Sequence, residues 1–158
     1  SGKGCPVIAM INTAGGRDLA ANQPGGDLPG VYIHVDSEWV IEQNPSIVLW
    51  EALIPNNNAG YQVNNSTAVE MMLNKFANIT GFSNIDAVKN QNVYSMSFYI
   101  LTETPWIGTV YLAKLLHPDL FQDIDPREVH QEYLKRFLHL DFDISKQRLF
   151  LYPIPEDW

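Results

Sequence analysis

Cysteine and basic residues are both scarce in this chain of 158 residues. Cys5 is the only cysteine, which excludes an intrachain disulfide, a cysteine-based metal site and a CxxC redox pair. Ten Lys and Arg stand against 18 Asp and Glu, for a net charge of -8, and the ten are scattered along the sequence. Because nucleic-acid binding needs clustered basic residues, no nucleic-acid partner is expected.

Long apolar runs are missing as well. No run reaches the roughly 18 apolar residues that indicate a transmembrane helix. No signal-peptide pattern is visible, and from the opening "SGKGCP" we expect a mature form or an excised piece. A hydrophobic content of 46% with 18% charged residues is typical of a globular chain of one domain.

Enzyme motifs are absent too: the sequence contains no GxSxG, HExxH, GxxxxGK[ST] or GxGxxG. The stretch "AGGRDLA" (14–20) resembles a phosphate loop, but its glycines follow an expected helix over 6–14, so helix termination explains them better. The four histidines are widely spaced, so neither a protein metal site nor a cofactor is predicted.

Hydrophobic periodicity and capping residues predict an α/β fold with a small parallel sheet. Asp36 or Ser37 caps a short helix that ends at Asn44-Pro45. "TAVE" (67–70) is a capping box for a helix that runs to Gly81. The remaining expected elements are strands over 31–35, 46–54 and 92–98, a loop over 99–105, helices from 105 and 126, and an irregular tail from 151.

Ligands of parallel sheets bind beyond the carboxyl ends of the strands. The loops expected there carry aromatic residues and few charges, which indicates a large, partly apolar ligand held by stacking. The two tryptophans have core packing as their alternative role. The candidate ligand-binding residues are Tyr32, His34, Trp50, Phe98, Tyr99, Thr102, Glu103 and Trp106.

An ordered set of segments, "AGGRDLAA", "VYIHVDSEWVIEQNPSIVLWEA", "IDAVKNQNVYSMS" and "GTVYLAKLLHPDLF", resembles one protein family. That family is the class III (long-helix) ABC-transporter periplasmic solute-binding proteins for iron-siderophore complexes and cobalamin, and the match is to their C-terminal lobe. Family members have two α/β lobes joined by a long helix, with the ligand between them. The resemblance implies a three-layer lobe over residues 1–140, with 141–158 as a C-terminal tail packed on it, and a missing N-terminal lobe.

The resemblance also implies a function. The chain is expected to be a non-enzymatic receptor lobe outside the cytoplasmic membrane, either periplasmic or a membrane-anchored lipoprotein. Its ligand would be a ferric siderophore or another iron chelate, with cobalamin or haem as the alternative. Since the protein would touch the chelator and not the metal, no protein metal ligands are expected.

The same resemblance implies a role for Glu38. An acidic residue at this place meets arginines on the membrane permease subunits of the transporter, so Glu38 is expected to be exposed on the rim of the strand-end loops. The alternative is that Glu38 only complements the dipole of its helix.

Two other classes of function stay open. A metal-ion receptor would use His34 with Glu103 or Glu51, and an α/β enzyme would use Glu51 or Glu103 as a general base.

The missing first strand of the lobe would leave an unpaired sheet edge, which predicts self-association of the fragment.

Overall fold

A computed structural model describes residues 5–22, 33–52, 59–61, 63–146, 149–156 and 158. The longer elements in chain order are α1 (Pro6–Thr13), α2 (Ser37–Gln43), β1 (Val48–Ala52), α3 (Thr67–Ala77), α4 (Asp86–Lys89), β2 (Val93–Ser97), α5 (Pro105–Leu116), α6 (Pro126–Phe137) and β3 (Leu151–Tyr152). Short 3-10 turns lie at Leu19–Asn22, Phe82–Asn84, Pro118–Leu120 and Ile144–Lys146, and a π-helical turn spans Tyr99–Glu103.

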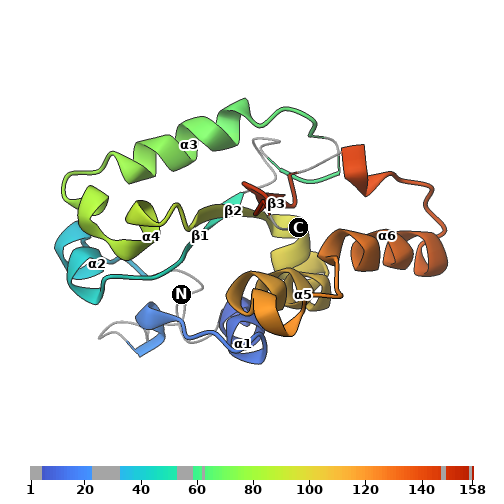
Figure 1. Cartoon of the computed structure of the whole chain (residues 1–158), viewed down its shortest axis with the longest axis horizontal. Coiled ribbons are helices and arrows are strands. Elements are labelled where there is room, and N and C mark those ends of the chain that lie inside the picture. Colours follow the sequence, from blue (N-terminus) through green and yellow to red (C-terminus); the bar gives the residue numbers. More distant parts are fainter. Residues whose placement is uncertain (1–4, 23–32, 53–58, 62, 147–148, 157) are drawn as a thin grey trace.

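The described strands form one mixed sheet in the order β1-β2-β3. β1 and β2 are parallel, with Val48 opposite Val93, and β3 joins β2 antiparallel, with Tyr152 opposite Ser95. Figure 1 shows α3 on one side of this sheet and α1 with α5 on the other. The predicted α/β fold with a small, mostly parallel sheet flanked by helices is confirmed.

The main core lies between the sheet and the α1–α5 layer. Successive side chains of β2 alternate between the two faces of the sheet, so Tyr94 and Met96 join this core while Ser95 and Ser97 face α3. Gly108 lets α5 approach closely, because a Cβ there would lie 2.1 Å from the carbonyl oxygen of Ile100. The other fully buried members include Ile107, Leu112, Leu134, Phe150 and Leu151.

Local capping signals operate largely as the sequence indicates. Asp36 caps α2 by accepting a hydrogen bond from the backbone N–H of Trp39 at 2.7 Å. Asn44 ends the same helix in the left-handed conformation, directly before Pro45. Gly15, at a φ of 83°, follows α1, so the interpretation of "AGGRDLA" as a helix end is confirmed.

Several local predictions were wrong. Ser66, not Thr67, is the N-cap of α3, and it makes no side-chain cap; its hydroxyl donates instead to the carboxylate of Glu70, which also accepts from Tyr152. The helix ends at Ala77, before Gly81. Residues 99–103 form a π-helical turn where a loop was expected, and the tail supplies β3.

The expected strand at 31–35 is only partly testable. Residues 33–35 have no strand assignment, and 31–32 lie outside the described residues.

Within the described part of the chain, no helix has the length and apolarity that crossing a bilayer requires.

Candidate ligand-binding site

The carboxyl ends of β1 and β2 lie at the same edge of the sheet because the two strands are parallel. Tyr61 follows β1 and Tyr99 follows β2, and their rings meet edge to face with centroids 5.2 Å apart. Gly60 has a φ of 115°, and a Cβ there would lie 2.6 Å from the Tyr99 ring. Only glycine fits comfortably at this position, so the local sequence brings the two tyrosines together.

Tyr61 is the centre of an aromatic cluster. Its ring lies 4.8 Å from that of Phe150, 5.2 Å from that of Phe142 and 5.8 Å from that of His130, all edge to face. Its hydroxyl is 3.0 Å from Nε2 of His130. Burial, with smaller contributions from Tyr133 and Tyr99, raises the pKa of Tyr61 to about 12, so the phenol stays protonated at ordinary pH.

His130 lies beneath this cluster and is fully buried. Burial lowers the pKa of His130 to about 4, because the charged imidazolium is poorly solvated there. The imidazole is therefore neutral at ordinary pH.

A row of aromatic side chains continues from the cluster along α6. Trp106, at the start of α5, meets Tyr133 with ring centroids 4.9 Å apart, and Tyr133 lies 5.9 Å from Phe137. Trp106 is 46% exposed and Phe137 70% exposed. We call the surface formed by Tyr61, Tyr99, Trp106, Tyr133 and Phe137 the strand-end face.

The structure places some of the predicted site residues at this face. Tyr99 and Trp106 belong to it. Thr102 and Glu103 lie in the adjoining π-helical turn, Thr102 donating its hydroxyl to the carbonyl of Phe98 at 2.7 Å and Glu103 exposed. Phe98 is half-buried at the start of that turn. Tyr32 lies outside the described residues.

Trp50 and His34 do not join these residues. Trp50 lies in the middle of β1 opposite Ser95, not in a strand-end loop as predicted, and its ring contacts Phe76 of α3 with centroids 6.1 Å apart. The indole is 39% exposed, so it is not a fully buried core residue either. His34 is exposed in the segment before α2.

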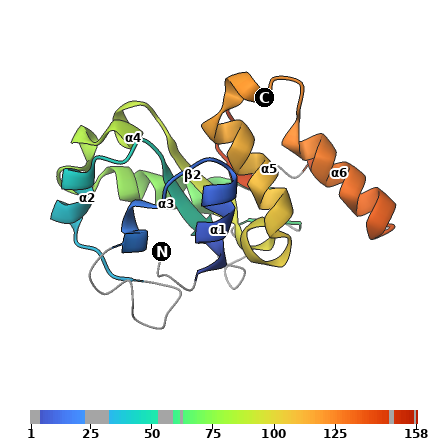
Figure 2. The ribbon, with the colours of Figure 1, turned by 90° about the horizontal axis from the view of Figure 1, so that it is seen from below.

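Glu38 is exposed in the first turn of α2, as predicted, and has no ion-pair partner within the part of the chain that the structure describes. Its expected position on the rim is wrong. Val40 and Ile41 of α2 pack beside Val48 and Val93, which begin the two parallel strands. Figures 1 and 2 likewise show α2 and α6 at opposite ends of the molecule.

The rival metal-receptor and enzyme hypotheses need clustered titratable groups. No group of three or more His, Cys, Asp or Glu able to hold a metal ion exists among the described residues. Glu51 follows Trp50 along β1, and alternation directs its side chain to the opposite face of the sheet.

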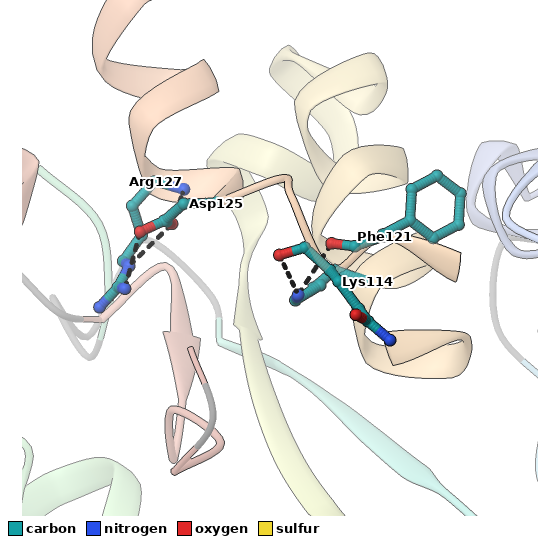
Figure 3. Close-up of polar contacts among 5 residues, drawn as sticks. Lys114, Phe121, Asp125 and Arg127 are labelled. Carbon is teal, nitrogen blue, oxygen red and sulfur yellow. Dashed lines mark hydrogen bonds and ion pairs between the residues drawn. The ribbon is translucent and has the colours of Figure 1, made fainter. Parts of the chain in front are cut away.

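A polar pocket lies away from the strand-end face, where α5 ends and α6 begins. Buried Lys114 donates there to the carbonyls of Phe121 at 2.8 Å and Gln122 at 3.4 Å, which holds the connecting segment (Figure 3). Burial alone would raise the pKa of Asp125, but the hydrogen bonds and charge of Arg127 outweigh it and lower that pKa. None of the predicted site residues lines this pocket.

Sequence reasoning missed Tyr61, His130, Tyr133 and Phe137. Tyr61 was detectable, because it lies in the loop that follows the predicted strand over 46–54, to which the strand-end rule applies. Tyr133 and Phe137 are spaced four apart on α6, which puts them on one helix face, but nothing local shows that this face adjoins Trp106.

The arrangement of a small sheet with helices on both sides is similar to one part of solved periplasmic binding proteins. The TroA-like periplasmic binding protein FepB from Veillonella parvula has a TM-score of 0.70 to this chain at 24% identity, covering 90% of this chain and 40% of FepB. Molybdate-bound MolA, the cognate periplasmic binding protein of the Haemophilus influenzae transporter HI1470/71, has a TM-score of 0.64 at 26% identity, over 90% of this chain and 39% of MolA.

A comparison with curated sequences agrees. The molybdate-binding protein MolA of Haemophilus influenzae is 28% identical over 147 residues, which are 89% of this chain and 36% of MolA. The chain thus spans well under half the length of these relatives. No family model matches the sequence. The resemblance to one lobe of a class III solute-binding protein is confirmed.

Proposed function

We propose that this chain is the solute-binding lobe of a receptor for an ABC importer, and that the strand-end face contacts the solute. The observation that carries the proposal is the aromatic row beyond the carboxyl ends of β1 and β2, in which Trp106 and Phe137 are exposed, on a fold similar to that of a TroA-like binding protein. A receptor of this kind acts outside the cytoplasmic membrane, binds without chemical conversion, and passes its solute to permease subunits.

The solute best suited to this face is a ferric siderophore or another iron chelate. Aromatic rings supply van der Waals and stacking area for a bulky organic surface. Cobalamin and haem satisfy the same description.

An oxyanion is the second candidate solute, because MolA is a molybdate-binding protein. The tyrosine hydroxyls of the strand-end face are neutral groups that can donate hydrogen bonds to oxo groups. Such binding would not require an arginine in this lobe.

The test is a tryptophan-fluorescence titration of the full-length two-lobe protein with a ferric trihydroxamate, haem, cyanocobalamin and molybdate. Trp106→Phe should abolish most of the response, because Trp106 lies in the strand-end face. The matched control is Trp50→Phe, which removes the indole beside α3 and should leave the response nearly unchanged. A response carried by Trp50 alone, or saturable binding of none of the four solutes, would contradict the proposal.

A further inference from the structure

We infer that His130 donates its Nε2–H to the hydroxyl oxygen of Tyr61, and that Tyr61 consequently offers its own O–H to the bound solute. Tyr61 is then a specificity-determining residue and His130 the residue that positions it. This inference rests on the proposed function and narrows the solute to one that presents an oxygen acceptor beside Tyr61.

The hydrogen bond joins two residues that are 69 positions apart in the sequence, at 3.0 Å between Oη of Tyr61 and Nε2 of His130. Within the described residues, neither side chain has another hydrogen-bond partner. Nδ1 of His130 is fully buried and has no such partner among them. The direction of the proton in this one hydrogen bond therefore decides what each side chain presents to its surroundings.

Two arrangements are compatible with a neutral imidazole, which carries one N–H. If Tyr61 donates to a bare Nε2, the N–H of His130 is on buried Nδ1 without an acceptor in the described structure. If His130 donates from Nε2, only a lone pair is left at Nδ1, and the O–H of Tyr61 is free. Orphaned buried N–H groups are rarer and costlier than unfilled lone pairs, so the second arrangement is favoured.

The free O–H of Tyr61 can be satisfied where the N–H of His130 cannot. Tyr61 is only half-buried and belongs to the strand-end face, whereas His130 is fully buried. Contacts with Phe142, Phe150 and Tyr99 hold the phenol ring, so its hydroxyl keeps one position. The raised pKa of Tyr61, about 12, keeps the proton on that hydroxyl.

A fixed donor selects for oxygen acceptors. Oxo groups of a tetrahedral oxyanion, hydroxamate oxygens of an iron chelate and amide carbonyls of a corrinoid all qualify. A solute that presents only donors or hydrocarbon at this point would leave the O–H of Tyr61 unpaired, which disfavours its binding.

The first experiment measures the histidine tautomer without any solute. Long-range ¹H–¹⁵N NMR of the full-length protein labelled with ¹⁵N-histidine distinguishes Nε2–H from Nδ1–H, and His130→Gln assigns the signal by its disappearance. We expect His130 to carry its proton on Nε2. A proton on Nδ1 overturns the inference, whatever the solute proves to be.

The second experiment measures affinity by calorimetry in the full-length protein, with molybdate and a ferric trihydroxamate as probes. Tyr61→Phe should weaken the probe that binds by about threefold to tenfold, the usual net effect of one hydrogen bond. Tyr111→Phe is the matched control, since it removes the hydroxyl of a buried tyrosine outside the strand-end face and should leave affinity unchanged. His130→Gln, which keeps an N–H donor, should retain more affinity than His130→Leu.

Unchanged affinity in Tyr61→Phe overturns the donor role. Binding of neither probe to the wild-type protein overturns the solute class, while the NMR measurement still decides the arrangement of His130 and Tyr61. The failure of the inference and that of the proposed function are therefore distinguishable.

Discussion

Single residues at the two ends of the molecule have different proposed roles. Tyr61 and His130 act through one hydrogen bond inside the aromatic cluster, whereas Glu38 stands exposed on α2 beside the amino ends of the strands. The role proposed for Glu38 is to pair with an arginine of the permease, since a rim carboxylate fixes orientation more than it adds affinity.

Substitution of Glu38 should separate docking from binding. Glu38→Ala and Glu38→Gln should leave solute affinity unchanged in the full-length receptor, because α2 is remote from the strand-end face. The free energy of unfolding should fall by no more than roughly 1 kcal/mol, the size of a helix-dipole contribution. Uptake by the purified transporter should fall substantially, since arginine recognises the charge.

The control is Glu42→Ala, an exposed carboxylate on the same helix but outside its first turn. Normal uptake by Glu38→Ala would remove the docking role and leave only the interaction with the helix dipole.

Buried His130 makes stability depend on pH. Its pKa is about 4 in the folded protein against 6.5 in the unfolded chain, so the unfolded chain binds the proton first and stability falls as pH decreases below about 6.5. Between pH 7 and pH 5 the loss should be roughly 2 kcal/mol for a shift of this size. Urea unfolding at the two pH values measures it.

His130→Gln should abolish most of that difference, whereas exposed His34→Gln should keep it. This pH window lies above the range in which Glu70, Asp125 and Asp143 titrate, since their pKa values are lowered. Equal pH dependence in His130→Gln and the wild type would show that another group is responsible.

At the scale of elements, the π-helical turn between β2 and α5 positions Tyr99 and Trp106, two members of the strand-end face. It closes with the backbone N–H of Thr104 donating to the carbonyl of Tyr99 at 2.8 Å, and Gly108 packs against the carbonyl of Ile100 in its middle. π-Helical turns are rare in proteins overall, and those that do occur often lie at functional sites. The turn and the first residues of α5 therefore form one packed unit that carries Tyr99 and Trp106.

Gly108→Ala should disrupt that unit. The new Cβ would lie 2.1 Å from the Ile100 carbonyl oxygen and 2.7 Å from the sulfur of Met10, so backbone must move. The expected loss in unfolding free energy is about 1–3 kcal/mol, typical of overpacking. Urea denaturation measures the loss, and half-exposed Thr109→Ala on the same helix should change stability by less than about 1 kcal/mol. A Gly108→Ala variant as stable as the wild type would mean that the backbone of the turn can shift to accommodate the new Cβ with no loss of unfolding free energy.

At the scale of the whole molecule, the described sheet ends at β1, which pairs only with β2 among the described strands. Among the described strands, the other side of β1 has no neighbour, and such an edge can invite pairing with another chain. Phe137, Leu138 and Leu140 add exposed apolar surface at the end of α6.

The isolated chain is therefore expected to self-associate. Light scattering over a concentration series should show a mass that rises above that of the monomer. Trp50→Lys introduces a charge on β1 and should shift the equilibrium toward monomer if β1 is the contact. A clean monomer at high concentration would contradict the prediction.

The sequence by itself determined the end of α1, both ends of α2 and the two parallel strands. Asp36, Gly15 and the Asn44-Pro45 pair act through bonds and dihedral angles within a few residues, so their effect is visible locally. The apolar runs of β1 and β2 are likewise local, which is why the α/β class and the strand-end edge could be predicted.

Only the tertiary structure decided which side chains meet at that edge. Tyr61 and His130 are 69 residues apart, and Trp106 finds Tyr133 because α5 and α6 pack together. Trp50 was assigned to the strand-end loops although it lies within the predicted strand over 46–54, and the structure places it in β1 opposite Ser95. The strand β3 has two residues, too few for a periodic pattern, and it forms because β2 offers it a partner. Contacts of this kind depend on how elements pack, and a sequence pattern reports only what lies within a few residues of itself.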